Sequence, residues 1–150
     1  MGRALVRAAA HDSRFLVCGG TERSDGQFLG IDLGALAGVA PLMMNTSETP
    51  NLAADKATVW IDFTAPAATI EALDALEGTP VRAAIVGTTG LSAEQEAKVA
   101  AHAKRIAIVR SGNFSLGVNL LAALVEQAAQ KLGPESVSYT HLTLPTKRIV

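Results

Sequence analysis

Short apolar runs alternate with alanine-rich amphipathic segments along this chain, and the alternation predicts strands and helices in turn. The apolar runs that we expect to form strands are residues 15–18, 39–44, 58–63, 81–86 and 106–109. The segments that we expect to form helices are residues 1–11, 66–77, 92–103 and 115–132. Strands that alternate with helices predict an α/β fold with a parallel sheet and right-handed crossovers.

Several helix ends carry recognisable local signals. Pro66 suits the first turn of a helix, where its missing N–H costs nothing. Ser92 and Gln95 have the spacing of a capping box, and Ser115 is a natural N-cap for the last long helix. Thr64 is expected to cap the helix that begins at Pro66.

Composition excludes several classes of protein. Hydrophobic residues make up 49% of the chain and charged residues 18%, which argues against intrinsic disorder. A net charge of −1 lacks the basic footprint of a nucleic-acid-binding protein, and the single cysteine, Cys18, has no partner for an internal disulfide. The apolar runs are shorter than the roughly 20 residues of a membrane-spanning helix. We therefore expect a cytoplasmic α/β protein, without nucleic-acid or membrane partners and without a metal site.

The candidate chemistry lies at the ends of the predicted strands, where α/β sheets bind ligands. Glu22 lies 20 positions beyond Gly2. If Gly2 is the last glycine of a phosphate-binding loop, this is the spacing at which an acidic residue contacts the adenosine ribose of a dinucleotide. Arg23 beside it could hold a 2′-phosphate, so the pair suggests tolerance of both NADH and NADPH. The alternative is a solvated Glu-Arg pair at a strand end.

Two further strand ends carry small and polar residues. The loop Gly87-Thr88-Thr89-Gly90 allows close backbone approach to a ligand and offers two hydroxyls, although an ordinary strand-to-helix loop is the alternative. In the loop 111–114, Asn113 can pair with an amide such as nicotinamide, and Phe114 can pack against a planar ring. Asp62 lies near the end of another predicted strand and, if it is buried, needs a partner that the sequence does not identify.

Together these motifs resemble the N-terminal nucleotide-binding domain of the 4-hydroxy-tetrahydrodipicolinate reductase (dihydrodipicolinate reductase) family. The resemblance covers about residues 1–134 in the family's order and spacing. The motifs that carry it are Met1-Gly2-Arg3 with Leu5, Thr21-Glu22-Arg23, Gly30-Ile31-Asp32-Leu33-Gly34 with Leu36-Ala37-Gly38, Ile61-Asp62-Phe63-Thr64-Ala65-Pro66, Gly87-Thr88-Thr89-Gly90, and Asn113-Phe114-Ser115 with Gly117-Val118-Asn119.

The resemblance implies a Rossmann-type, doubly wound parallel sheet whose first strand is missing from this chain. It implies an oxidoreductase that transfers hydride from NADPH or NADH to a cyclic precursor in the diaminopimelate route to lysine. Met1 would be the last residue of the phosphate-binding turn. The positions expected to contact the cofactor are Met1, Glu22, Arg23, Gly87, Thr88, Thr89, Ser111, Gly112, Asn113 and Phe114. No catalytic residue is expected within the chain.

Both ends of the chain depart from the family pattern. The family's first strand and most of its glycine-rich loop precede the position matched by Met1, and its paired histidines and lysine have no counterpart after residue 134. We therefore expect a truncated dinucleotide-binding domain over residues 1–134, a non-native tail over 135–150, and no activity from the chain alone. The whole enzyme would take a small-molecule substrate and form a homotetramer through the part that is absent here. The alternatives are a non-catalytic NAD(P)-binding module and another Rossmann dehydrogenase.

Overall fold

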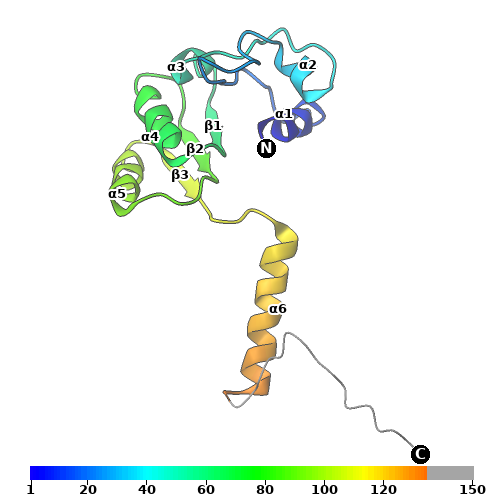
Figure 1. Ribbon diagram of the computed structural model, residues 1–150, viewed down its shortest axis with the longest axis vertical. Coiled ribbons are helices and arrows are strands. Elements are labelled where there is room, and N and C mark those ends of the chain that lie inside the picture. Colours follow the sequence, from blue (N-terminus) through cyan, green and yellow to red (C-terminus); the bar gives the residue numbers. More distant parts are fainter. Residues whose placement is uncertain (135–150) are drawn as a thin grey trace, which may run out of the picture. The chain divides into compact units, whose positions relative to one another are not determined.

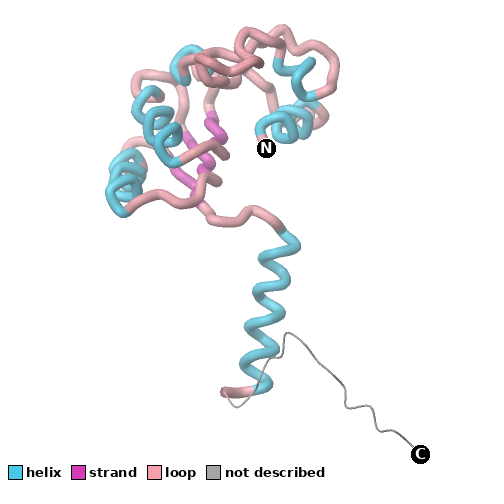
Figure 2. Tube along the Cα trace, in the orientation of Figure 1, coloured by secondary structure: helices cyan, strands magenta, loops and turns pink. Residues whose placement is uncertain are grey.

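The computed structural model describes residues 1–134, and residues 1–112 form one compact unit while a second unit begins at Asn113. Figures 1 and 2 show the elements of both units. The strands of the first unit are Val59–Asp62 (β1), Ala83–Val86 (β2) and Ala107–Arg110 (β3). Its helices are Gly2–Ala10 (α1), Leu33–Ala37 (α2), Pro50–Ala53 (α3), Pro66–Ala75 (α4) and Ala93–His102 (α5). The second unit contains Leu116–Leu132 (α6).

The three strands form a parallel sheet in the order β1-β2-β3, and α4 and α5 are the crossover helices. Asp62 is paired with Val86, and Val86 with Arg110, so the three strands end level with one another. This confirms the predicted parallel α/β arrangement for three of the five apolar runs. It also brings the segments that follow β1, β2 and β3 to one edge of the sheet.

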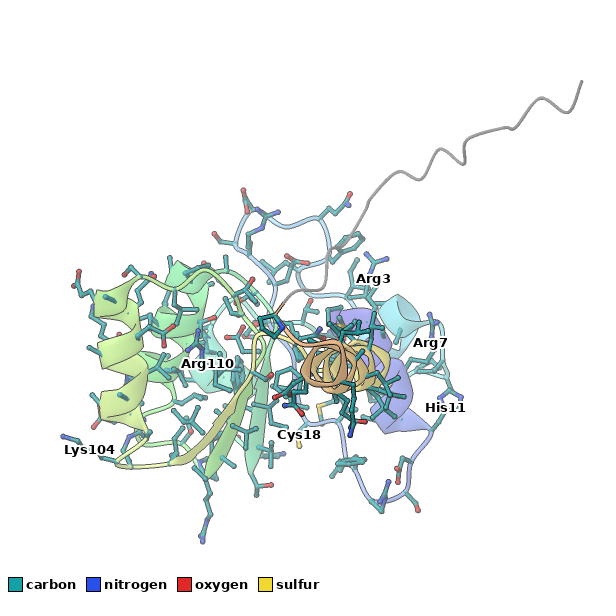
Figure 3. The ribbon with its side chains drawn as sticks, turned by 90° about the horizontal axis from the view of Figure 1, so that it is seen from below. Arg3, Arg7, His11, Cys18, Lys104 and Arg110 are labelled. Carbon is teal, nitrogen blue, oxygen red and sulfur yellow. The ribbon has the colours of Figure 1, made fainter. Side chains whose placement is uncertain are left out.

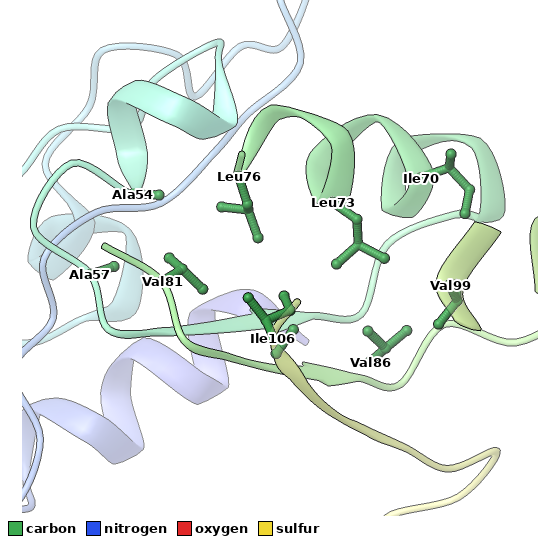
Figure 4. Packing of buried hydrophobic residues seen from close by; sticks show 10 residues of the cluster. Ala54, Ala57, Ile70, Leu73, Leu76, Val81, Val86, Val99 and Ile106 are labelled. Carbon is green, nitrogen blue, oxygen red and sulfur yellow. The ribbon is translucent and has the colours of Figure 1, made fainter. Parts of the chain in front are cut away.

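The hydrophobic core fills the space between α4, α5 and one face of the sheet (Figure 4). Leu73 and Leu76 on the α4 side are fully buried, and Val86 of β2 lies in the same cluster with Val99 of α5 and Ile106. Burial of side chains of this size contributes roughly 1.5–3 kcal/mol each. The core therefore holds β2 firmly against the two helices that follow β1 and β2.

The ends of α4 and α5 differ from each other in their capping. The Ser92 hydroxyl accepts from the Gln95 N–H (3.2 Å), and the Gln95 side chain accepts from the Ser92 N–H (2.9 Å), which confirms the predicted capping box of α5. In α4 the N-cap is Ala65, with no side-chain capping bond. The prediction that Thr64 caps α4 is wrong, because the Thr64 hydroxyl donates to Asp62 instead.

The predictions of strands at 15–18 and 39–44 are also wrong. A strand needs a neighbour that completes its ladder, and in this part of the described chain only two isolated bridges form, Thr21 with Ser47 and Asp32 with Asn45. Phe15 and Leu16 are exposed. The composition of the run at 15–18 suits a buried strand, but no neighbouring strand among the described residues completes its backbone ladder.

Two short helices between α1 and β1 were not predicted. Asp32 caps the first of them, α2, and its carboxylate accepts from the N–H groups of Ala35 (3.0 Å), Leu42 (3.2 Å) and Met44 (3.2 Å). These bonds, the one from Ala35 foremost, lower the pKa of Asp32. The second short helix, α3, begins at Pro50.

Helix α1 lies beside α2, and its basic side chains point toward different neighbours (Figure 3). The Arg3 guanidinium lies 4.2 Å from the centre of the Phe28 ring. The Arg7 Nε donates to the Ala37 carbonyl at the end of α2 (2.7 Å). His11 Nδ1 lies 2.7 Å from the Arg7 carbonyl oxygen, within α1's own last turn.

The second unit begins with a well-defined helix start. The Ser115 hydroxyl accepts from the Val118 N–H (3.4 Å), which confirms Ser115 as the N-cap of α6, and Gly133 ends the helix at a φ of 77°. Within residues 1–134, no helix is both long enough and apolar enough to cross a membrane. The tail expected over residues 135–150 lies outside the described residues.

Candidate functional site at the carboxyl end of the sheet

The candidate site is built by the segments that leave β1, β2 and β3 at the same edge of the sheet. The Gly87 N–H donates to the Asp62 carbonyl (2.8 Å), and the Ser111 N–H donates to the Val86 carbonyl (3.3 Å). These two bonds continue the ladder just beyond the strands. They place residues 63–65, 87–90 and 111–112 side by side, at the edge where α/β sheets bind ligands.

Asp62 is the centre of a buried polar network at this edge. Its side chain is almost fully buried, at 3% exposure. Asp62 Oδ1 accepts from the Thr64 N–H (2.9 Å), from the Thr64 hydroxyl (2.6 Å) and from the Thr88 hydroxyl (3.2 Å). A buried carboxyl needs such donors, and here one set comes from the segment after β1 and the other from the segment after β2.

The hydroxyls of the network have one self-consistent direction. Thr69 of α4 is fully buried, and its hydroxyl donates to Thr88 Oγ1 (2.8 Å), which also accepts from the Thr64 N–H (3.1 Å). Because each hydroxyl has a single proton, the chain of donors runs from Thr69 to Thr88 to Asp62. The Thr64 proton also goes to Asp62, so its contact with Thr69 Oγ1 at 3.5 Å is not a second donated bond.

The two threonines of the Gly87–Gly90 loop therefore have different environments. Thr88 is 3% exposed and points into the network, whereas Thr89 is exposed. Gly87 lies against the Phe63 ring, so closely that an added Cβ would be 2.1 Å from Phe63 Cε1. Gly90 has a φ of 79° and open space where a Cβ would be. The outer surface of the loop is thus formed by Thr89 and by small, accessible backbone positions.

The third strand end contributes Ser111 and Gly112 to the same edge. Ser111 is fixed by its backbone bond to Val86, and Gly112 has no heavy atom within 4 Å of a built Cβ. Asn113 and Phe114 belong to the second unit. There the Asn113 side-chain oxygen accepts from the Ser115 N–H (2.7 Å), so this amide helps to form the start of α6.

The remaining predicted positions lie on other elements of the first unit. Met1 is the exposed N-cap of α1, and its carbonyl accepts from the N–H groups of Ala4 and Leu5. Glu22 Oε1 accepts from the N–H of Arg23 (2.9 Å), whose guanidinium faces Asp25 at 3.9 Å. The Glu22-Arg23 side chains thus form contacts within their own turn.

Sequence reasoning missed the roles of Asp62, Thr64 and Thr69 as one network. The sequence alone indicates that Asp62 needs a partner if it is buried, and it predicts a helix cap for Thr64. A signal for the network was present, since Asp62 ends one strand and Thr88 follows the next strand of a parallel pair. Among the described residues, no group of histidine, cysteine or acidic side chains has an arrangement that could hold a metal ion.

Comparison with known proteins gives the family of the chain. The family described as "Dihydrodipicolinate reductase, N-terminus" matches residues 1–114. The 4-hydroxy-tetrahydrodipicolinate reductase of Brucella abortus (strain 2308) is 43% identical over 138 residues, which is 90% of this chain and 50% of that protein. The enzyme of the same name from Methylocella silvestris is 44% identical over 135 residues, covering 90% of this chain and 49% of the relative.

A third relative, 4-hydroxy-tetrahydrodipicolinate reductase 1 of Mesorhizobium japonicum, is 41% identical over 153 residues, covering 100% of this chain and 55% of that protein. The chain thus spans about half the length of the curated relatives it matches. The family match includes all three strand-end segments of the first unit, from Asp62 through Gly112. The chain belongs to the dihydrodipicolinate reductase family and corresponds to its N-terminal part.

Proposed function

We propose that this chain is the part of a 4-hydroxy-tetrahydrodipicolinate reductase that binds the reduced dinucleotide, NADH or NADPH, at the carboxyl end of the β1-β2-β3 sheet. The three parallel strands would belong to a Rossmann-type, doubly wound arrangement. The observation that carries the proposal is the juxtaposition of the three strand-end segments at one edge, with an exposed Thr89 and accessible glycine backbone above a buried polar network.

The residues at this edge fit a dinucleotide in their chemistry. Gly90 and Gly112 leave open space at the backbone, which allows a ligand to approach N–H and C=O groups closely. Thr89 and Ser111 add hydroxyls that can donate to or accept from a ligand. The Thr88 hydroxyl would hold the loop in place and not bind the ligand, because it already accepts from Thr69 and donates to Asp62.

Other predicted contacts belong to the same proposal. Glu22 would accept from the adenosine ribose and Arg23 would face the 2′-phosphate of NADPH, which requires Arg23 to exchange its long contact with Asp25 for the ligand. Met1, at the start of α1, would lie near the pyrophosphate, where helix N–H groups favour anions. Contact of Asn113 and Phe114 with the nicotinamide stays a prediction from the sequence.

The bound dinucleotide would supply a hydride, and the protein would supply its position and its electrostatic surroundings. Reduction of the cyclic substrate is proposed for a whole protein of the length of the curated relatives, which are about twice as long as this chain. For this chain the proposal is cofactor binding without turnover. A family match over residues 1–114 favours this assignment over another dehydrogenase family.

Isothermal titration calorimetry of the 150-residue chain with NADH and with NADPH tests the proposal. Saturable binding is expected, and Thr89→Asp should weaken it, because a carboxylate at the exposed loop repels the anionic ligand. Thr58→Asp is the matched control, since Thr58 is also exposed but precedes β1, at the opposite end of the sheet. Equal effects of the two substitutions would reject the carboxyl edge as the site, and absence of binding by the wild-type chain would reject the function.

A further inference from the structure

We propose that Asp62 is a positioning residue that couples the segment after β1 to the segment after β2, so that Thr89 and the backbone of residues 87–90 are presented to the ligand in one fixed arrangement. The inference rests on the proposed dinucleotide function. It adds a residue that is almost fully buried, at 3% exposure, and therefore acts through Thr88 and Gly87 and not by its own contact with the ligand.

Asp62 joins the two segments through both its backbone and its side chain. Its carbonyl accepts from the Gly87 N–H (2.8 Å) and its Oδ1 accepts from the Thr88 hydroxyl (3.2 Å), so it contacts the first two residues of the loop after β2. The same Oδ1 accepts two bonds from Thr64 in the segment after β1. One carboxylate oxygen therefore holds both Thr64 and Thr88, which are 24 positions apart in the sequence.

Thr88 closes the connection from the other side. Its Oγ1 accepts from the Thr64 N–H (3.1 Å), so the two segments are joined directly as well as through Asp62. It also accepts from Thr69, which ties the loop to the buried face of α4. Removing the Thr88 hydroxyl would leave the buried Thr69 hydroxyl without this acceptor and take one donor from Asp62.

All the side-chain hydrogen bonds of Thr88 are made by its hydroxyl, so substitutions can test the hydroxyl apart from the methyl group. Thr88→Val keeps the shape and loses every bond of the network at this position, whereas Thr88→Ser keeps the hydroxyl. Bonds to a buried carboxylate are strong, so we expect Thr88→Val to weaken NADPH binding about tenfold or more. Thr88→Ser should stay within about threefold of the wild type, because its hydroxyl can still donate to Asp62.

Hydrogen–deuterium exchange of the 150-residue chain measures the coupling without any ligand. In Thr88→Val, exchange should accelerate about tenfold or more in peptides covering 62–66 as well as in those covering 86–92. Asp62→Asn should show the reciprocal effect on 86–92. Val99→Ala, which removes part of a buried α5 side chain outside the network and outside both segments, is the control for general loss of stability, because general unfolding accelerates exchange across the whole core and not selectively at these two segments.

Titration of the same variants with NADPH, followed by nicotinamide fluorescence, tests the consequence for binding. Acceleration in both segments, with weaker binding that Thr88→Ser restores, supports the proposal. Acceleration confined to 86–92, or equal behaviour of Thr88→Ser and Thr88→Val, overturns the coupling. Coupled exchange with unchanged affinity overturns the positioning role while leaving the proposed function intact. If the wild type binds neither dinucleotide, the proposed function fails, and exchange alone decides whether Asp62 couples the segments.

Discussion

Gly87→Ala should destabilise the first unit, because the Phe63 ring occupies the space that a methyl group would need. A Cβ built at Gly87 would lie 2.1 Å from Cε1, 2.4 Å from Cδ1 and 2.6 Å from Cζ of that ring. Ordinary van der Waals contact between carbon atoms needs about 3.5 Å or more. The Phe63 ring would therefore have to move by roughly an ångström or more, or the loop 87–90 would have to move away from β1.

The magnitude follows from the cost of overpacking. Forcing an extra methyl group into a packed position costs typically 1–3 kcal/mol, and we expect Gly87→Ala to lower the free energy of unfolding by about that amount. Phe63→Ala removes the obstacle, so Gly87→Ala in that background should cost less than about 0.5 kcal/mol. The double-mutant cycle should then give a coupling of about 0.5 kcal/mol or more. Gly112→Ala is the control, since no heavy atom lies within 4 Å of its built Cβ.

Urea denaturation followed by tryptophan fluorescence measures all four proteins of the cycle. The single tryptophan, Trp60, lies on β1 and packs against the core cluster, so its emission reports on the first unit. Gly112→Ala should stay within about 0.5 kcal/mol of the wild type. The steric argument is refuted if Gly87→Ala is as stable as Gly112→Ala. It is refuted equally if Gly87→Ala costs the same with and without the Phe63 ring.

Three further predictions concern the fold around the site. Leu73→Ala should lower the free energy of unfolding by about 2–5 kcal/mol in the same urea assay, because Leu73 is fully buried, whereas Leu52→Ala at a 68% exposed position should change it little. Ser92→Ala should cost about 0.5–2 kcal/mol by loss of the α5 cap, and an unchanged midpoint would contradict the capping box. Backbone hydrogen bonds, chiefly the one from the Ala35 N–H, lower the pKa of Asp32 in the folded state. The contribution of the Asp32 carboxylate to stability is therefore present above the pKa of the unfolded state and is lost as the pH falls through the pKa of the folded state. The difference in stability between wild type and Asp32→Asn should therefore be constant above about pH 5 and shrink below it, and a pH-independent difference would contradict this assignment.

Local signals predicted the elements whose formation depends on nearby residues. The capping box of Ser92 and Gln95 and the proline at the start of α4 need only their own turn, and both were confirmed. The prediction of a strand at 15–18 is wrong because a strand depends on a partner elsewhere in the chain. Its composition suits a strand, yet the described residues give this region only the bridge between Thr21 and Ser47.

In the candidate site too, features that depend on neighbouring residues could be predicted, whereas contacts between distant segments could not. Each of the loops at 87–90 and 111–112 could be identified from its small and polar residues, but their meeting at one edge depends on the level register of Asp62, Val86 and Arg110. The sequence predicts a cap at Thr64 because a threonine just before a helix commonly accepts a bond from the first turn of that helix. Its actual acceptor is Asp62, which becomes available only because the carboxyl group turns toward the buried side of the sheet.

The different roles of Thr88 and Thr89 follow from the alternation of side chains along a strand. In β2 the buried positions are Ala84 and Val86, on the face that α4 and α5 cover. Because successive side chains point to opposite faces, the same alternation continued past the strand directs Thr88 inward and Thr89 outward, as observed. Asp62 is the register partner of Val86 in the sheet, so the two side chains point to the same face. The buried network is thus a consequence of register and alternation, and a reading that combined the two could have paired Asp62 with Thr88 before the structure was known.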